Sequence, residues 1–260
     1  HANSIACDAT GNVFVAGYSQ SNDLPTQNPG GAVYFQGTNA GAYDVFLLKF
    51  NTSSARQWAT YYGGSGNEFS MGLDTYDNLA VDNCGNVYLG FETASNNTPV
   101  QSSCDAGYID NSFNGARDQF ITLFSNTGIR RWATYLGGNG VDFRCPLAVD
   151  INSNLFVAGE WTNQAPITNS TYPLTDPGGG AYYDPTYNGG LDDAFLVKFT
   201  PVPLNATAAV TNCSMMCNGA ITLSLVSGGC TPYTYLWNNA ATTQSISNLC
   251  SGVYSVSTKD

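Results

Sequence analysis

Trp58-Ala59-Thr60-Tyr61-Tyr62-Gly63-Gly64 returns 74 residues later (132 − 58) as Trp132-Ala133-Thr134-Tyr135-Leu136-Gly137-Gly138, with a single change. Two other phrases repeat at nearly the same spacing. Gly11-Asn-Val-Phe-Val-Ala-Gly17 has counterparts that start at Gly85 and Ser153, and Asp44-Val-Phe-Leu-Leu-Lys-Phe50 has counterparts that start at Asp118 and Asp193. A period of this length predicts a supersecondary unit whose copies must stack to bury their apolar faces.

Each unit contains four β-type runs separated by turn residues. In the second unit they cover 57–62, 78–81, 86–91 and 119–124. The Asp and Gly residues of 82–85 predict a tight turn between two short strands. Four strands in each repeated unit are typical of a β-propeller blade, and the alternatives are a solenoid or a string of small sandwiches. The sequence therefore predicts an all-β chain with a partial β-propeller, three four-stranded blades of a larger array, in residues 1–200.

The three repeated phrases, taken together and in this order, resemble the bacterial SBBP propeller repeat over about residues 1–200. The resemblance implies a secreted or surface bacterial protein without catalytic residues. Closed propellers have four or more blades, whereas the Asp-x-Phe strand occurs three times here. We therefore expect further blades before His1, where the chain reads as the interior of a longer polypeptide, or another chain that covers the open edge.

A long loop lies inside each unit, at about 18–43, 92–117 and 160–192. Tyrosines recur in these loops every 74 residues, which predicts that the loops fold back and pack, with ligand contact as the alternative. The predicted packing signature between blades consists of these tyrosines and the two repeated tryptophans: Tyr34, Tyr108, Tyr182, Trp58 and Trp132.

A Pro-rich linker at 201–204 ends the array, and residues 205–260 have a different pattern. Ile221, Leu223 and Leu225 alternate with polar residues, as in a strand with one buried face. Several short runs of this kind, separated by Gly, Asn and Ser, predict a small Ig-like β-sandwich.

This terminal module resembles the SprB-type repeat in its segments 217–223, 228–237 and 249–260. Such repeats occur in large surface adhesins of gliding Bacteroidota. The resemblance implies export by the type IX route and a role in gliding or surface attachment.

Eight cysteines favour disulfides and an oxidising compartment, and hence an extracellular or cell-surface location. The disulfide candidates are Cys213, Cys217, Cys230 and Cys250. Three pairings are possible among them, and a Cys230–Cys250 bridge would close a loop of about twenty residues, worth roughly 3 kcal/mol.

The formal net charge of −11, with only 8 Lys and Arg residues, argues against a nucleic-acid partner. The sequence contains no run of eighteen apolar residues, so it predicts no membrane span. Ca²⁺ binding at Asp8, Asp82 and Asp150 is an alternative to simple turn capping by these residues.

The chain has one histidine, His1, and none of the common catalytic motifs, so we expect no catalytic, metal or cofactor residues. Glu68, Glu92 and Glu160 remain candidates for the carboxylate pair of a glycosidase. The rings of Trp58, Trp132 and Trp237 could instead stack on sugars.

These patterns predict a non-enzymatic segment of a large secreted adhesin or extracellular appendage, which serves as a rigid display platform with a stalk module. The expected partners are other domains of the same polypeptide, with surface glycans or proteins and a homo-oligomer as further options. The alternatives are a carbohydrate-binding or carbohydrate-cleaving propeller and a self-assembling fibre subunit.

Overall fold

The computed structural model describes residues 1–68, 78–102, 107–162, 172–176, 178–180, 183–186, 188, 190–201, 205–213, 216–227 and 233–259. These residues are all-β, with seventeen strands and no helix among them. They form two compact units, of which the first covers residues 1–102 and 108–200 and the main part of the second covers 201–260.

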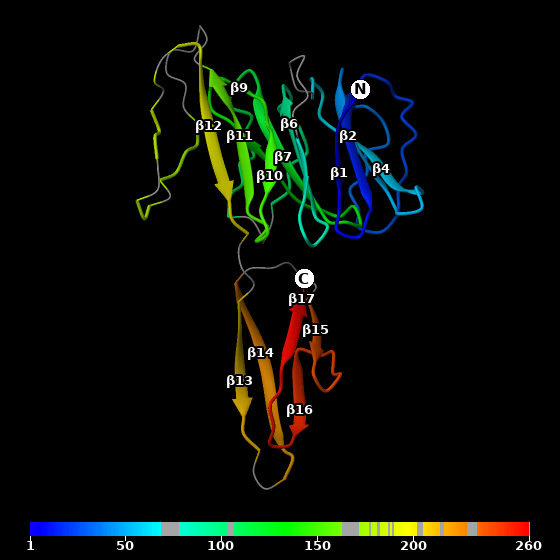
Figure 1. Cartoon of the computed structure of the whole chain (residues 1–260), viewed down its shortest axis with the longest axis vertical. Helices are drawn as coiled ribbons and strands as arrows, with labels where there is room; N and C mark the ends of the chain where they lie inside the picture. Colours follow the sequence, from blue (N-terminus) through cyan, green and yellow to red (C-terminus); the bar gives the residue numbers. More distant parts are fainter. Residues whose placement is uncertain are drawn as a thin grey trace. The chain divides into compact units, whose positions relative to one another are not determined.

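The first unit contains three antiparallel sheets that stand beside one another (Figure 1). The first sheet has the order β1 (Ala2–Cys7), β2 (Val13–Ser19), β3 (Asp44–Phe50) and β4 (Arg56–Tyr62). The second sheet repeats this order with β5 (Leu79–Val81), β6 (Val87–Thr93), β7 (Asp118–Phe124) and β8 (Arg130–Leu136).

The third sheet departs from the predicted four-stranded blade. Its members are β9 (Val141–Phe143), β10 (Leu147–Val149), β11 (Leu155–Thr162) and β12 (Asp192–Phe199). Both β9 and β10 pair with β11, so the sheet is three strands wide and ends at β12. The cause is in the sequence, because no Trp-Ala-Thr strand follows Phe199 to fill the outer position.

The Trp-Ala-Thr strand belongs to a different sheet from the one predicted. The repeat pattern groups this strand with the strands that follow it, but Arg56–Tyr62 pairs with β3, which precedes it. A short turn explains this pairing, because Asn51 Oδ1 accepts the backbone N–H groups of Ser53 and Ala55 and closes a hairpin.

The first and second sheets share one apolar core. Leu47 of the first sheet and Leu79, Leu89 and Phe120 of the second sheet are buried in one cluster. Flat apolar faces on both sides of the second sheet explain why all seven residues of β6 and of β7 are buried.

Aromatic contacts between the sheets repeat with the period of the sequence. Phe124 contacts the rings of Trp58 and Tyr34 across the first boundary, at centroid distances of 6.3 and 6.2 Å. Phe199 makes the same contacts with Trp132 and Tyr108 across the second boundary, at 5.3 and 5.6 Å. Tyr182, the third tyrosine of this series, lies outside the described residues.

The long loops fold back along the outer strands. In the first sheet, Gln27 and Ala59 exchange backbone hydrogen bonds, and Tyr61 N–H donates to the carbonyl of Gln36. In the second sheet, Gln101 and Ala133 exchange the same bonds, and Tyr135 N–H donates to Asp110. Each loop therefore covers the backbone edge of β4 or β8, which would otherwise be open to pairing with another strand.

The second unit consists of two small sheets, β13 (Asn205–Thr211), β14 (Gly219–Ser227) and β16 (Ser245–Leu249) in one, and β15 (Thr234–Trp237) and β17 (Val256–Lys259) in the other. Its core contains Leu223, Trp237, Ile246 and Leu249. Small antiparallel sheets are therefore shown here, and the Ig-like arrangement stays a prediction.

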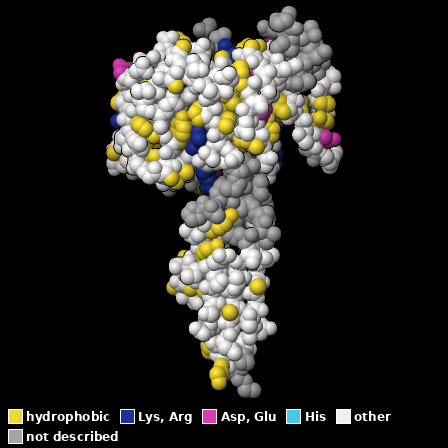
Figure 2. Space-filling model, turned by 180° about the vertical axis from the view of Figure 1, so that it is seen from behind, with side chains coloured by type: hydrophobic (Ala, Val, Ile, Leu, Met, Phe, Trp, Pro, Cys, Tyr) yellow, Lys and Arg dark blue, Asp and Glu magenta, His cyan; other side chains and the backbone are white. Residues whose placement is uncertain are grey.

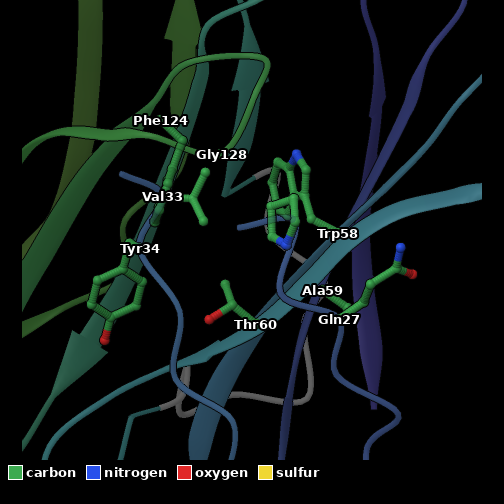
Figure 3. Close-up of a pocket in the computed structure, with 9 residues that line it drawn as sticks. Gln27, Val33, Tyr34, Trp58, Ala59, Thr60, Phe124 and Gly128 are labelled. Atoms are coloured by element: carbon green, nitrogen blue, oxygen red, sulfur yellow. The ribbon is translucent and has the colours of Figure 1, made fainter. Parts of the chain in front are cut away.

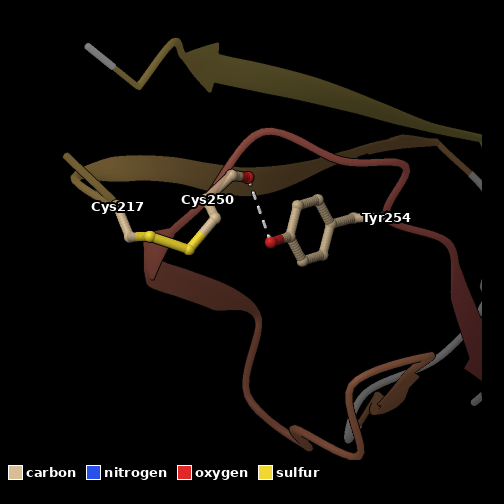
Figure 4. The surroundings of a disulfide bond; sticks show 3 residues. All are labelled: Cys217, Cys250 and Tyr254. Atoms are coloured by element: carbon tan, nitrogen blue, oxygen red, sulfur yellow. Dashed lines mark hydrogen bonds between the residues drawn. A yellow bond between two sulfur atoms is a disulfide. The ribbon is translucent and has the colours of Figure 1, made fainter. Parts of the chain in front are cut away.

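A disulfide joins Cys217 to Cys250 in the second unit, and Tyr254 Oη donates a hydrogen bond to the Cys250 carbonyl (Figure 4). The Cys230–Cys250 bridge considered from the sequence is therefore wrong, because Cys250 is already paired across the start of β14 and the end of β16. Cys213 is a free thiol, and Cys230 lies outside the described residues.

The three sheets of the first unit do not close into a ring within the described residues. The propeller arrangement therefore stays a prediction. In the part of the chain that is described, no helix has the length and hydropathy needed to cross a membrane.

Candidate functional site: paired buried carboxyl groups

Two buried carboxyl groups meet at the end of the outer strand of the first sheet. Asp44 begins β3, and Glu68 lies in the segment that leaves β4 for the second sheet. A Cβ atom placed on Gly63 would lie 2.5 Å from Glu68 Oε2 and 2.6 Å from Asp44 Oδ1. Glycine at position 63 is therefore what allows the two carboxyl groups to approach the strand end together.

An equivalent pair lies where the chain passes from the second sheet to the third. Asp118 begins β7, Asp142 lies in β9, and both side chains are fully buried. A Cβ atom on Gly137 would lie 2.6 Å from Asp142 Oδ2 and 2.8 Å from Asp118 Cγ. The two sites also share a backbone donor, because Gly64 N–H donates to Glu68 and Gly138 N–H donates to Asp142.

Each pair connects two neighbouring sheets. Glu68 accepts hydrogen bonds from Thr93 and Ser95, at the end of β6 in the second sheet, while Asp44 belongs to the first. Asp142 lies opposite Trp161 of β11 in the third sheet, while Asp118 belongs to the second. We call these two pairs the carboxyl clasps, because they hold the chain where it passes from one sheet to the next.

Burial raises the pKa values of the four carboxyl groups in the clasps. Removal from water raises the pKa of Asp118 to about 7 and that of Asp142 to about 8, from an ordinary value of 3.8. Burial also raises the pKa of Asp44 and that of Glu68. These groups consequently keep protons at pH values where an exposed carboxyl would be ionised.

The hydrogen bonding of the clasps is consistent with bound protons. The Oδ1 atoms of Asp44, Asp118 and Asp142 are buried and have no hydrogen-bond partner. A buried polar atom without a partner is costly, and a proton held between two carboxyl groups supplies a donor. The arrangement is therefore suited to a structural acid pair at Asp44 and Glu68, whose side chains are hydrogen-bonded to each other, whereas Asp142 interacts electrostatically with Asp118.

The third repeat lacks a clasp. Asp193 is the counterpart of Asp44 and Asp118, but it is partly exposed and accepts a hydrogen bond from the Asn188 N–H group. In the first two repeats the second carboxyl comes from the segment that leads to the next sheet. The described residues of the first unit contain no fourth sheet to provide it.

The carboxylates considered for glycoside hydrolysis are held by structural partners, and Arg144 contacts two of them. Glu68 belongs to a clasp. Glu92 is buried, forms an ion pair with Arg117 at 3.0 Å and accepts the Arg144 N–H group with its other oxygen. Glu160 is half-buried and forms an ion pair with Arg144 at 3.3 Å.

The three aspartates considered for Ca²⁺ cap equivalent turns. One oxygen of each accepts backbone N–H groups two and four residues later, and the other accepts the side-chain amide of Asn12, Asn86 or Asn154. The Asn154 amide is the main reason that the pKa of Asp150 lies below its ordinary value. Partial burial alone would raise the pKa of Asp8, but its hydrogen bonds outweigh this and lower it. These bonds support turn capping.

The three tryptophans considered for sugar stacking are buried in their own units. Trp58 faces a small pocket between β4, the loop after β2 and the turn after β7, with Val33 and Tyr34 across from it (Figure 3). Trp132 donates its indole N–H to Tyr108, and Trp237 donates to Thr243. Their rings therefore serve packing and are not presented to a ligand.

The clasps were missed at the sequence level, apart from Glu68. A signal was present, because Glu68 and Asp142 are acidic residues 74 positions apart (142 − 68) and each follows a repeated Gly-Gly. Their pairing with Asp44 and Asp118 could not be read from the sequence, since the partners come from different strands.

Comparison with known proteins places one family within the second unit. A family model described as the SprB repeat matches residues 212–242. This match confirms the SprB part of the predicted resemblance, and SprB repeats are typical of cell-surface proteins. The resemblance of residues 1–200 to SBBP repeats stays a prediction.

A more distant similarity covers a larger part of the chain. An uncharacterised WD repeat-containing protein of Acanthamoeba polyphaga mimivirus is 22% identical over 178 residues, which are 62% of this chain and 12% of that protein. The chain therefore corresponds to only a small part of this relative's length.

Proposed function

We propose that this chain is a non-enzymatic segment of a surface adhesin or extracellular appendage, in which the first unit is a rigid display platform and the second is a stalk module. The observation that carries the proposal is the SprB match in the second unit, which follows in the sequence a unit whose sheets pack on a shared apolar core. The Cys217–Cys250 disulfide supports an oxidising, extracellular location.

The chemistry of the first unit supports a mechanical role. Its buried carboxyl groups join neighbouring sheets, and its repeated tryptophans and loop tyrosines pack between sheets. Sheets fixed to one another in this way hold their loops in place, which a display platform requires. The WD repeat in the relative's name also favours a propeller, since WD repeats form propeller blades.

Most of the surface visible in Figure 2 is formed by neutral polar groups and backbone, with hydrophobic side chains between them and few charges. Such a surface is suited to contacts with neutral glycans or proteins. Export by the type IX route, a part in gliding or attachment, and an origin in Bacteroidota follow from the SprB resemblance and belong to the proposal.

Adhesion under flow tests this function. Beads coated with the full chain should be retained on glycan- or protein-coated surfaces, and beads coated with the heat-denatured chain should not. Equal retention of the two kinds of bead, or none on any surface, would contradict the proposal.

Polysaccharide turnover tests the enzymatic alternative. We expect none for the wild type. Turnover that is lost in Glu160→Gln or Glu92→Gln, with the thermal unfolding curve unchanged, would overturn the non-enzymatic assignment.

A further inference from the structure

The first sheet exposes an apolar face whose repeat counterparts are buried. Ile5 of β1 is 71% exposed, whereas its counterparts Leu79 and Leu147 are 6% and 7% exposed. Val13 and Val15 of β2 are half-buried on this same face. Their counterparts in the other two sheets are fully buried: Val87, Leu89, Leu155 and Val157.

The third sheet exposes its other apolar face, whose counterparts in the first and second sheets are buried. Leu196 of β12 is 68% exposed, whereas its counterparts Leu47 and Ile121 are fully buried. Phe156 and Ala158 of β11 are half-buried beside it. The corresponding positions of the first sheet, Phe14 and Ala16, are fully buried.

Within the chain, the face of one sheet that corresponds to Leu196 packs against the face of the next sheet that corresponds to Ile5. Leu47, on the face of the first sheet that corresponds to Leu196, lies in one buried cluster with Leu79, the counterpart of Ile5. The two end faces are therefore the unmatched halves of an interface that the chain makes between its own sheets. We call them the Ile5 face and the Leu196 face.

A polar contact follows the same pattern. The ammonium group of Lys49 crosses to the second sheet and donates to the carbonyl of Asn126 at 2.7 Å. Lys198 is its counterpart in the third sheet and is exposed on the Leu196 face. The repeat register makes Thr52 the counterpart of Asn126, and Thr52 is also exposed.

We propose that the Leu196 face of one copy docks on the Ile5 face of a second copy of this chain. A second copy is the occupant that the structure favours, because it offers the complement of both faces and continues an interface already present within the chain. Lys198 would then reach Thr52 of the second copy. This assembly deepens the platform role and depends on the sheet array, not on adhesion.

The interface is head-to-tail, so it produces either a closed ring or an open filament. Radial arrays of four-stranded sheets close with about four to eight sheets. Two copies contribute six, and three copies would exceed the range. For the 260 residues of this sequence, the assembly is therefore a closed dimer, with two identical head-to-tail contacts.

Sedimentation across a concentration series tests the proposal. The wild type should reach a single species of twice its mass of 27.6 kDa. Leu196→Lys and Ile5→Glu should each weaken self-association by about 100-fold, because each buries an unpaired charge in both contacts. Both residues are exposed in the single chain, so thermal unfolding should be unchanged when it is measured at concentrations at which the wild type is also monomeric. The matched control is Ile129→Glu, at a 41% exposed position in the turn between β7 and β8 of the second sheet, which forms neither end face, and it should remain dimeric.

Mixing the two variants gives the decisive measurement. A mixed dimer has one wild-type contact and one contact in which the introduced lysine faces the introduced glutamate, so an equimolar mixture should recover the dimer. A wild type that stays monomeric, a dimer unaffected by either substitution, a ladder of larger species, or variants that do not recover on mixing would each overturn the proposal. Loss of bead adhesion with the dimer intact would instead contradict only the proposed function.

Discussion

Gly63 and Gly137 determine how closely the clasp carboxyl groups approach the outer strands. A methyl group at Gly63 would overlap both Asp44 and Glu68. We expect Gly63→Ala to lower the free energy of unfolding by about 1–3 kcal/mol, because a buried acid pair must move. Denaturant unfolding measures this loss. Gly107→Ala is the matched control, since an added Cβ there meets no atom within 4 Å and should change stability by less than about 0.5 kcal/mol.

The clasps also predict an unusual response to pH. Asp118 and Asp142 have pKa values of about 7 and 8 in the folded chain, above their ordinary value, so the folded state binds protons more tightly than the unfolded state. The stability that these protons contribute is complete at acid pH and is lost as the pH rises toward 8. We expect the melting temperature to fall between pH 5 and pH 9.

Asp142→Asn isolates this effect, because an amide cannot ionise. At pH 9 the variant should unfold with a free energy higher than that of the wild type by on the order of 2 kcal/mol, and the difference should shrink toward pH 5. Asp23→Asn, at an exposed carboxyl, also replaces an aspartate by an amide and should leave the pH profile unchanged. A wild-type melting temperature that rises from pH 5 to pH 9 would contradict the assignment.

At the level of single residues, the sequence predicted roles that depend on local spacing. Asp8, Asp82 and Asp150 lie within four residues of the groups they bind, and a turn-capping role could be read directly from the Asp and Asn positions. The partner of Cys250 and the partner of Asp118 depend on which strands lie side by side. Spacing along the chain does not contain that information.

Among the elements, the loops are tied to the outer strands by tyrosines. Tyr135 Oη of β8 donates to the Ser95 carbonyl and accepts the Thr98 N–H group. Tyr61 of β4 holds the first loop in the same way, through Ser21 and Leu24. The repeated tyrosine therefore fixes the start of the first two long loops.

We expect Tyr135→Phe to reduce the free energy of unfolding by about 1–3 kcal/mol, because the buried Thr98 N–H group and Ser95 carbonyl lose their partner. Proteolysis within residues 94–117 should become faster, which mass spectrometry of limited digests would show. Tyr183→Phe, at an exposed ring, should leave both properties unchanged. An unaltered digest for Tyr135→Phe would mean that other contacts hold the loop.

Strand positions were predictable because the repeats supply several views of one unit. The strand expected at 119–124 is observed at Asp118–Phe124, and the one expected at 86–91 is observed at Val87–Thr93. The sheet to which Arg56–Tyr62 belongs was predicted wrongly. A periodic sequence shows what recurs but does not show where one unit ends, and the short turn at Asn51 decides that boundary.

At the level of the whole molecule, the two units have separate cores and should unfold independently. The Cys217–Cys250 disulfide spans 33 residues of the second unit only. Removing such a link costs about 3–4 kcal/mol on the chain-entropy model. Calorimetry of Cys250→Ser should therefore show one transition moved to lower temperature and the other unchanged.

Cys213→Ser is the matched control for this experiment, because Cys213 is a free thiol in the same unit and should shift neither transition. A single cooperative transition that moves as a whole in Cys250→Ser would show that the two units are energetically coupled.

The loops that cover β4 and β8 have a consequence for how such a protein can evolve. In each complete repeat a long loop pairs with the backbone edge of the outer strand, so a duplicated repeat adds no unpaired strand edge. Gene duplication or deletion can then change the number of repeats without creating an open strand edge that promotes aggregation. Variation in length should be tolerated in whole steps of 74 residues, and truncation within a repeat should not.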